Sequence, residues 1–301
     1  MTTRRTVRWR SALTLAVLAA VFAGCALTAQ QKAAVSQFSD SATTLGDVSS
    51  SELKVMRDET IKMTTERLLL GGKSKDPNLG DQTSLDRGFE VTRVETVSGA
   101  TRALAAYGKS LAALVDDTQS AELKAASNEF VASLGRVPAA KDKLSDKQLE
   151  AIGTAVQEVG GLLVEWKRKQ ALTTIVKESR QAVDQLCDLL ARDFDPQRGW
   201  VAQQLLVVEA PLVGEATDAL FNARTYNDRK TTLEAFRLAQ GSRMRRTEVV
   251  KRVADTAKAM KKANEALAQA VENSAWSIQD IQSFAERARS LQTAVKTIVT
   301  D

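Results

Sequence analysis

Apolar side chains in this sequence recur at alternating spacings of three and four residues over long stretches. This spacing places every member on one side of an α-helix, and such a stripe, or seam, is what coiled coils bury between helices. No stretch of useful length alternates apolar and polar residues as a half-buried strand does. The chain is therefore expected to be all-α. The clearest seam consists of Ile281, Phe284, Ala288, Leu291, Val295 and Ile298.

The same spacing recurs in segments 97–114, 149–166 and 250–271. Asn264 occupies a seam position in the last of these, where a polar side chain can fix the register of packed helices at some cost in stability. Seams of this kind can close within one chain or between two chains. Oligomerisation through the heptad seams is therefore an open alternative.

Turn-forming residues and helix caps divide the chain into long helices. At 1.5 Å per residue, a helix over 145–193 would be about 70 Å long, which exceeds the diameter of a compact domain. The sequence therefore predicts an elongated antiparallel helical bundle with coiled-coil-like long helices. The expected helices cover 29–70, 84–116, 118–136, 145–193, 197–223, 229–271 and 277–299.

Local signals add three expectations. Ser49 followed by Glu52 matches a capping box and predicts a helix start near residue 49. Ser145 followed by Gln148 matches the same device and predicts another start. Pro211 lies inside an apolar run and is expected to kink or break its helix, because proline lacks a backbone N–H.

The sequence contains no histidine. Ser-His-Asp and Cys-His nucleophile systems, His-containing zinc sites and Glu-x-x-His di-iron bundles are therefore excluded. We expect no cofactor and no metal site. A carboxylate enzyme stays open, but it needs a cleft that raises the pKa of one acid. Four aspartates cluster where a helix is expected to end, and the simpler interpretation is a solvated face. They are Asp184, Asp188, Asp193 and Asp195.

The N-terminus has the composition of an export signal. The first ten residues hold four arginines and no acid, and an almost wholly apolar run then ends at Phe22. The run is about half the ~20 residues that span a bilayer. Small Ala23 and Gly24 precede Cys25. This arrangement resembles the signal peptide of bacterial lipoproteins, in which cleavage between Gly24 and Cys25 leaves the cysteine as the lipidated first residue. The resemblance covers residues 1–26.

The resemblance implies a protein that an N-terminal lipid holds at a membrane of the bacterial cell envelope. Ala26, rather than Asp, follows the cysteine, which implies the outer membrane, facing the periplasm, by the sorting rule of enteric bacteria. In a Gram-positive cell the same signal implies the outer face of the plasma membrane. The expected domains are a signal peptide (1–24), a lipidated cysteine with tether and first helical segment (25–48) and a helical bundle (49–301), with a sub-boundary near 137–144 as an alternative.

Cleavage would also remove most of the net positive charge. The whole chain has 42 basic and 37 acidic residues, and the leader holds four of the basic ones, so the mature chain has a net charge of +1. We therefore expect no nucleic-acid partner. Cys187 would be the one remaining free thiol, and its leucine-rich surroundings predict a buried apolar role.

A basic stripe lies over residues 237–262. When the Val250 seam is extended backward, Arg243 and Arg246 fall on it, and unpaired charges are costly to bury. The helix is therefore expected to break near Gly241 or to be held out from the core. The stripe either pairs with acidic helices of the same chain or docks on an acidic partner or anionic lipid. The candidate docking residues are Arg243, Arg245, Arg246, Lys251 and Arg252.

These features favour a non-catalytic, lipid-anchored envelope protein that acts as a structural spacer, adaptor or accessory subunit and has a protein partner in the envelope. The alternative is a helical membrane-acting protein of the pore-forming kind, which needs a concealed apolar hairpin. The most apolar stretch, 201–213, contains Glu209 and Pro211, which argues against that alternative. A carboxylate-based enzyme is the third interpretation.

Overall fold

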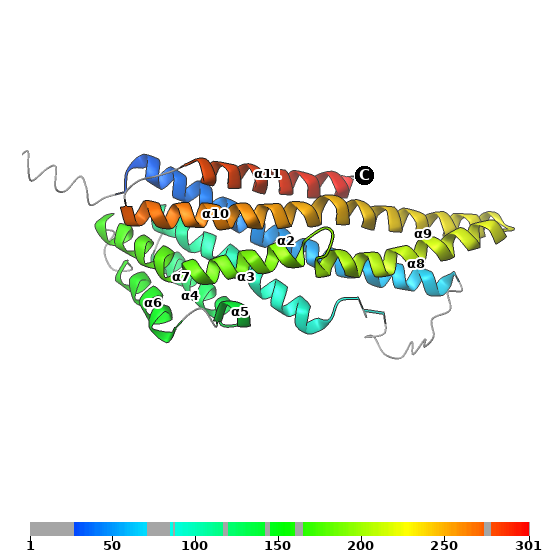
Figure 1. Cartoon of the computed structure of the whole chain (residues 1–301), viewed down its shortest axis with the longest axis horizontal. Helices are drawn as coiled ribbons and strands as arrows, with labels where there is room; N and C mark the ends of the chain where they lie inside the picture. The colour runs from blue at the N-terminus through cyan, green and yellow to red at the C-terminus, as the bar shows by residue number, and fades with distance from the viewer. Residues whose placement is uncertain are drawn as a thin grey trace, which may run out of the picture.

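The computed structural model describes residues 27–70, 85–86, 88–116, 120–141, 145–159, 165–273 and 278–300. The described residues form helices and no strand, and the long helices run along one common axis (Figure 1). The all-α class and the elongated antiparallel bundle are confirmed. The elements are α2 (Ala29–Leu69), α3 (Val91–Val115), α4 (Ser120–Leu134), α5 (Pro138–Lys141), α6 (Asp146–Val159), α7 (Glu165–Asp193), α8 (Trp200–Asn222), α9 (Tyr226–Arg245), the π turn η2 (Arg246–Val250), α10 (Lys251–Asn273) and α11 (Gln279–Thr300).

Two long helical rods run the length of the molecule (Figure 1). The first is α2, whose 41 residues span about 60 Å at 1.5 Å per residue. The second is formed by α9, η2 and α10, which follow one another without interruption from Tyr226 to Asn273. The other helices pack around these rods at different positions along their length.

The apolar core has two parts, which divide the molecule into a body and an arm. The arm consists of the C-terminal part of α2 with α8 and α9. Its core is small and contains Met63, Val208, Leu212, Ala216, Ala235 and Ala239. The body contains α3, α4, α5, α6, α7, α10 and α11 around the N-terminal part of α2. In Figure 1 the arm is the right-hand end, where α8 and α9 meet.

Glycines allow α2 and α3 to approach closely inside the body. A Cβ atom on Gly46 would lie 2.4 Å from the carbonyl oxygen of Thr101, and one on Gly108 would lie 2.5 Å from the carbonyl oxygen of Ser39. Any side chain at these positions would meet backbone, which cannot rotate away as a side chain does. The two helices therefore depend on glycine for their packing distance.

Asn264 lies at the buried seam position predicted for it. The hydroxyl of Tyr107 donates to Asn264 Oδ1 at 2.9 Å, and Asn264 Nδ2 donates to Asp184 Oδ1 at 3.3 Å. Val253 and Leu267 of the same seam are buried inside the single chain. This part of the seam therefore closes within the protein.

The prediction of one helix over 145–193 is wrong. The segment forms α6 and α7, which pack against each other, and Gln148 Nε2 donates to the carbonyl oxygen of Glu178 at 3.3 Å. Because 148 lies at one end of α6 and 178 lies beyond the first turns of α7, the pair is antiparallel. Folding back brings both apolar stripes into one core. The glycine pair 160–161 falls between the helices, outside the described residues.

The helix start predicted at Ser49 is also wrong. Ser49 and Glu52 are buried inside α2, which runs unbroken across them. The first helix begins instead with a capping box at Thr28. The backbone N–H of Gln31 donates to Thr28 Oγ1 at 3.2 Å, and Gln31 Oε1 accepts from the N–H of Thr28 at 2.9 Å. A buried glutamate in mid-helix needs a partner from elsewhere in the chain.

The capping box at Ser145 is confirmed, because the N–H of Gln148 donates to Ser145 Oγ at 3.3 Å and Gln148 Oε1 accepts from the N–H of Ser145 at 3.0 Å. Pro211 does not break α8, which continues past it for three turns. Proline leaves the carbonyl four residues earlier without its helical donor. That carbonyl belongs to Val207, on the exposed side of α8, where water can satisfy it.

Candidate interaction surface

The helix does not break at Gly241. α9 runs through this residue to Arg245, and η2 then leads directly into α10. The π turn adds one residue to a helical turn and so changes which side chains face the interior. Arg245 is buried, whereas Arg243 is exposed and Arg246 is half-buried. The break predicted near Gly241 and the seam positions predicted for Arg243 and Arg246 are therefore wrong.

Arg245 makes a buried ion cluster with two glutamates of α2. Its Nη1 lies 2.6 Å from Glu52 Oε2, and its Nε lies 3.0 Å from Glu59 Oε1. Burial alone would lower the pKa of Arg245, but the charges of Glu59 and Glu52 outweigh it and the pKa is raised. Burial raises the pKa of Glu59 although Arg245 opposes the shift. The cluster joins the two long rods where the arm leaves the body.

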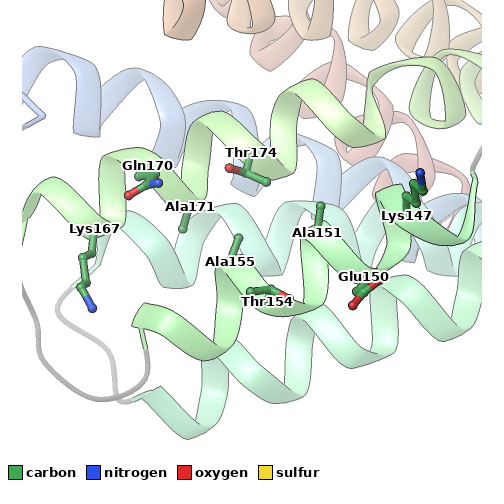
Figure 2. A pocket seen from close by; sticks show the side chains of 9 residues that line it. All are labelled: Lys147, Glu150, Ala151, Thr154, Ala155, Lys167, Gln170, Ala171 and Thr174. Atoms are coloured by element: carbon green, nitrogen blue, oxygen red, sulfur yellow. The ribbon is translucent and has the colours of Figure 1, made fainter.

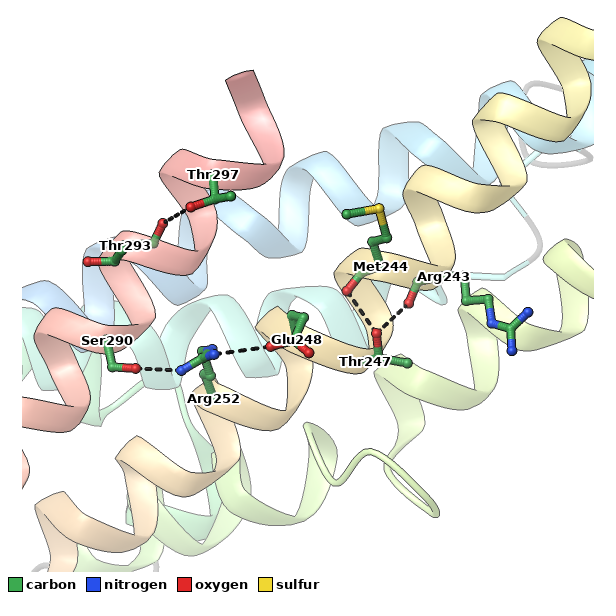
Figure 3. Close-up of polar contacts among 8 residues, drawn as sticks. All are labelled: Arg243, Met244, Thr247, Glu248, Arg252, Ser290, Thr293 and Thr297. Atoms are coloured by element: carbon green, nitrogen blue, oxygen red, sulfur yellow. Dashed lines mark hydrogen bonds and ion pairs between the residues drawn. The ribbon is translucent and has the colours of Figure 1, made fainter. Parts of the chain in front are cut away.

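Two more arginines of the basic stripe pair within the protein. Arg246 Nε lies 3.3 Å from Glu209 Oε2 of α8. Arg252 donates to Glu248 Oε2 at 3.1 Å and to the hydroxyl of Ser290 in α11 (Figure 3). The structure therefore does not bring the five candidate docking residues into one surface. Arg245 faces α2 and cannot contact an external acidic group.

Arg243 and Lys251 are the exposed members of the set and make no ion pair among the described residues. In Figure 3 no dashed line reaches the Arg243 side chain, while the hydroxyl of Thr247 donates to the carbonyl oxygens of Arg243 and Met244. Arg243 belongs to the arm and Lys251 to the first turn of α10, so the two cations lie on different parts of the rod.

The four clustered aspartates do not converge on one site. Asp184 accepts from Asn264, and Asp188 lies 2.7 Å from the Lys261 ammonium. Asp193 is buried 2.9 Å from the Arg93 guanidinium. Asp195 accepts from the backbone N–H groups of Gln197 and Arg198, which hold the pKa of this carboxyl below its usual range. No group of three metal-ligating side chains occurs within the described residues.

Cys187 is a free, buried thiol of the body core, and burial raises its pKa. This placement agrees with the packing role predicted for it. Cys25 and Gly24, the predicted lipidation and cleavage residues, lie outside the described residues. Helix α2 begins at Ala29, four residues after Cys25, and its start lies at the end of the molecule opposite the arm (Figure 1).

A pocket of about 370 Å³ lies between α6 and α7. Figure 2 shows its alanines pointing between the two helices and Lys147 and Lys167 at opposite ends. A second pocket of about 250 Å³ lies between α10 and α11 and is lined by both acidic and basic side chains. Polar and charged side chains make up most of the lining of both pockets, so neither has the predominantly apolar wall that is usual for a small-molecule site.

The exposed face of α8 is the most unusual surface of the arm. Five of its residues follow the alternating spacing of a seam, and we call them the outer seam. Among them Leu206 is 39% exposed, Val213 37% and Leu220 39%. Large apolar side chains at regular helical spacing are normally covered by a neighbouring helix. The outer seam consists of Leu206, Ala210, Val213, Thr217 and Leu220.

A second, inner seam lies directly beside the outer one on α8. Leu205, Glu209, Leu212 and Ala216 each precede an outer-seam residue by one position, and all four are buried. The inner seam packs against α2 and α9. The sequence contained this signal, because two seams in register mark a helix with two covered sides. It was missed because 201–213 was interpreted as one undivided apolar run.

Further exposed groups extend the surface beyond the outer seam. Val207 is 61% exposed, and Phe221 and Tyr226 at the tip of the arm are 86% and 80% exposed. Arg229 and Arg237 join Arg243 as exposed cations of α9 that make no ion pair among the described residues. The arm therefore offers an apolar helix face beside a helix with unpaired positive charge.

No family model matches this sequence, and no curated protein or solved structure matches it. Within the described residues, no helix is both long enough and apolar enough to span a bilayer.

Proposed function

We propose that the protein is a non-catalytic adaptor of the bacterial cell envelope, anchored by lipid at Cys25 in the outer membrane and facing the periplasm. The main support for the proposal is the position of helix α2. Helix α2 begins four residues after Cys25, and its other end contributes to the arm, where the outer seam is exposed. A single helix thus links the predicted anchor to the candidate docking surface.

The length of that helix gives the adaptor its second property. Its 41 residues correspond to about 60 Å. The lipid would hold one end at the membrane, while the arm would present its apolar surface to a protein of the periplasm. The protein would thus act as a spacer as well as an adaptor. Two or three acyl chains at about 0.8 kcal/mol per buried methylene are sufficient for stable anchoring.

The contacts of the four clustered aspartates support a non-catalytic role. Each member of the aspartate cluster has its own partner, so none is left beside another acid in a cleft. A carboxylate enzyme needs two acids that share a site and have separated pKa values. The four clustered aspartates do not form such a pair.

The membrane-acting alternative is favoured by one observation, the exposure of Phe221 and Tyr226 at the tip of the arm. Aromatic side chains at such a tip suit the interface of a bilayer. Release of dye from liposomes by the mature protein would support this alternative, and loss of release in a Phe221→Ser variant would locate it at the tip.

Metabolic labelling with an alkyne-bearing palmitate tests the anchor. The wild-type protein is expected to carry label in the membrane fraction, and Cys25→Ser to carry none. Cys187→Ala is the matched control and should keep the label, because Cys187 is buried. Unlabelled wild-type protein, or labelled Cys25→Ser, would refute anchoring at this residue.

A further inference from the structure

The outer seam of α8 resembles half of a helix–helix interface. Its large residues, Leu206, Val213 and Leu220, recur every seven positions, and small Ala210 and Thr217 lie between them. Alternating large and small residues form the knobs and holes that receive a second helix. From Leu206 to Leu220 the seam covers about 21 Å, or four helical turns.

The charges beside the seam restrict what can cover it. Arg229, Arg237 and Arg243 of α9 are exposed and make no ion pair among the described residues. The acids of α8 do not pair with them: Glu209 pairs with Arg246, Glu215 lies 2.9 Å from Arg67, and the exposed Asp218 makes no ion pair among the described residues. Arg229 and Arg243 lie within about 40° of each other around α9, whereas Arg237 lies about 120° from Arg243, at roughly 100° per residue. A helix that lies against α8 and α9 would therefore place one of its edges beside Arg229 and Arg243. Opposite charge on that edge is favourable, and like charge is costly.

We infer that the outer seam binds an amphipathic helix of a partner protein, apolar on one face and acidic on one edge, which packs lengthwise on α8 beside α9 and extends the three-helix arm to four helices. The inference deepens the proposed function and rests on it only for the location of the partner in the envelope. The apolar face would contact the outer seam, and the acidic edge would pair with Arg229 and Arg243.

A second copy of this chain fits the surface less well. If α8 of another copy covered the outer seam, its exposed face would bring Asp218 as its carboxylate, because Glu209 is buried and Glu215 is paired. One carboxylate cannot match both Arg229 and Arg243. A lipid bilayer would cover the apolar residues, but fluid acyl chains do not require a regular alternation of large and small side chains. An acidic amphipathic helix satisfies both the spacing and the charge.

Photo-crosslinking in the cells that produce the protein tests the occupant. A photoreactive residue is placed at Val207, which is 61% exposed beside the outer seam, or at Val91 of α3, which is 55% exposed and serves as the control. We expect a protein adduct from Val207 and none from Val91. Mass spectrometry of the adduct should identify a heptad-patterned segment of another protein with more acidic than basic residues. An adduct with a second copy, with lipid alone, or no adduct at Val207 would overturn the inference.

A peptide made from the crosslinked segment tests the charge. Fluorescence anisotropy is measured with the full mature protein in detergent. Arg243→Glu is expected to weaken binding about tenfold, and changing the facing acid of the peptide to lysine should restore it. Arg136→Glu, at an exposed site of the body, is the control and should bind like the wild type. Equal binding by Arg243→Glu and the wild type would contradict the acidic edge.

The lipid anchor at Cys25 and the helix-binding surface of α8 can be refuted independently of each other. Absence of lipid label at Cys25 together with an adduct at Val207 would refute the anchor and leave the helix-binding surface standing. Lipid label without an adduct would refute the helix-binding surface and leave the anchor standing.

Discussion

The guanidinium of Arg245 lies 2.6 Å from a carboxylate oxygen of Glu52, a residue 193 positions away in the sequence. Arg245 is 6% exposed and Glu52 2% exposed, so the pair is shielded from water. Glu59 adds a second carboxylate to the same guanidinium. This contact holds the two long rods together where the arm begins, and it depends on the π turn that turns Arg245 inward.

Arg245→Ala should lower the free energy of unfolding by about 3–5 kcal/mol, because it leaves two carboxylates buried without a cation. Urea denaturation followed by circular dichroism measures the change. Arg243→Ala, which removes an exposed cation two residues away, should stay within about 0.5 kcal/mol of the wild type. Equal effects of the two variants would show that the buried cluster does not stabilise the arm.

Glu59→Gln should raise the free energy of unfolding at neutral pH. The Oε2 atom of Glu59 is buried without a hydrogen-bond partner among the described residues, and the pKa of Glu59 lies above its ordinary value of 4.5. An acid with a raised folded-state pKa binds protons more tightly in the folded state, so its ionisation destabilises the fold as pH rises. The gain in Glu59→Gln should therefore shrink as pH falls toward 4.5. Urea denaturation between neutral pH and pH 4 measures the difference in free energy of unfolding between the variant and the wild type. A difference that grows on acidification would contradict a raised pKa of Glu59.

Two glycine substitutions should change the stability of the protein in opposite directions. Gly46→Ala places a Cβ atom 2.4 Å from a backbone oxygen of α3 and should destabilise the body by about 1–3 kcal/mol. At Gly241 a Cβ atom would meet nothing within 4 Å, so Gly241→Ala should stabilise α9 by roughly 0.5–1 kcal/mol. Thermal denaturation distinguishes them. Destabilisation by Gly241→Ala would indicate that the rod bends there.

Asn264→Ala should lower the free energy of unfolding by about 1–3 kcal/mol, because the buried hydroxyl of Tyr107 loses its hydrogen-bond acceptor. Combining Asn264→Leu with Tyr107→Phe removes both polar groups and should recover much of the loss. The free energies of unfolding of the wild type, Asn264→Leu, Tyr107→Phe and the double variant form a double-mutant cycle. Strict additivity would mean that the hydrogen bond contributes nothing.

The sequence was sufficient to predict the fold class and part of the packing, because heptad spacing is a local property. It placed Asn264 correctly in a buried seam and identified Ser145 as a helix cap. It misassigned Ser49 and Glu52 as a cap, since a short Ser-x-x-Glu match does not reveal that Arg245 approaches from far along the chain.

The remaining errors also have physical causes. A π turn shifts a helix by one residue without a strong local signature, so extension of the Val250 seam selected Arg243 and Arg246 in place of Arg245. The chain reverses between α6 and α7 so that the apolar stripes of both helices pack into the body core. This packing depends on the whole chain and not on the local sequence. The outer seam of α8 was readable in the sequence, but its exposure was not.

Energy transfer to a membrane measures whether the predicted anchor and the docking surface lie at opposite ends of the protein. A donor is attached to Gln30→Cys or to Phe221→Cys, each in a Cys187→Ala background, and the lipidated protein is placed on vesicles that carry an acceptor lipid. Both sites are exposed. Strong transfer is expected from position 30 and weak transfer from position 221, because about 60 Å of α2 separates the two ends. Equally strong transfer from position 221 would place the arm at the bilayer and rule out a docking surface held away from the membrane.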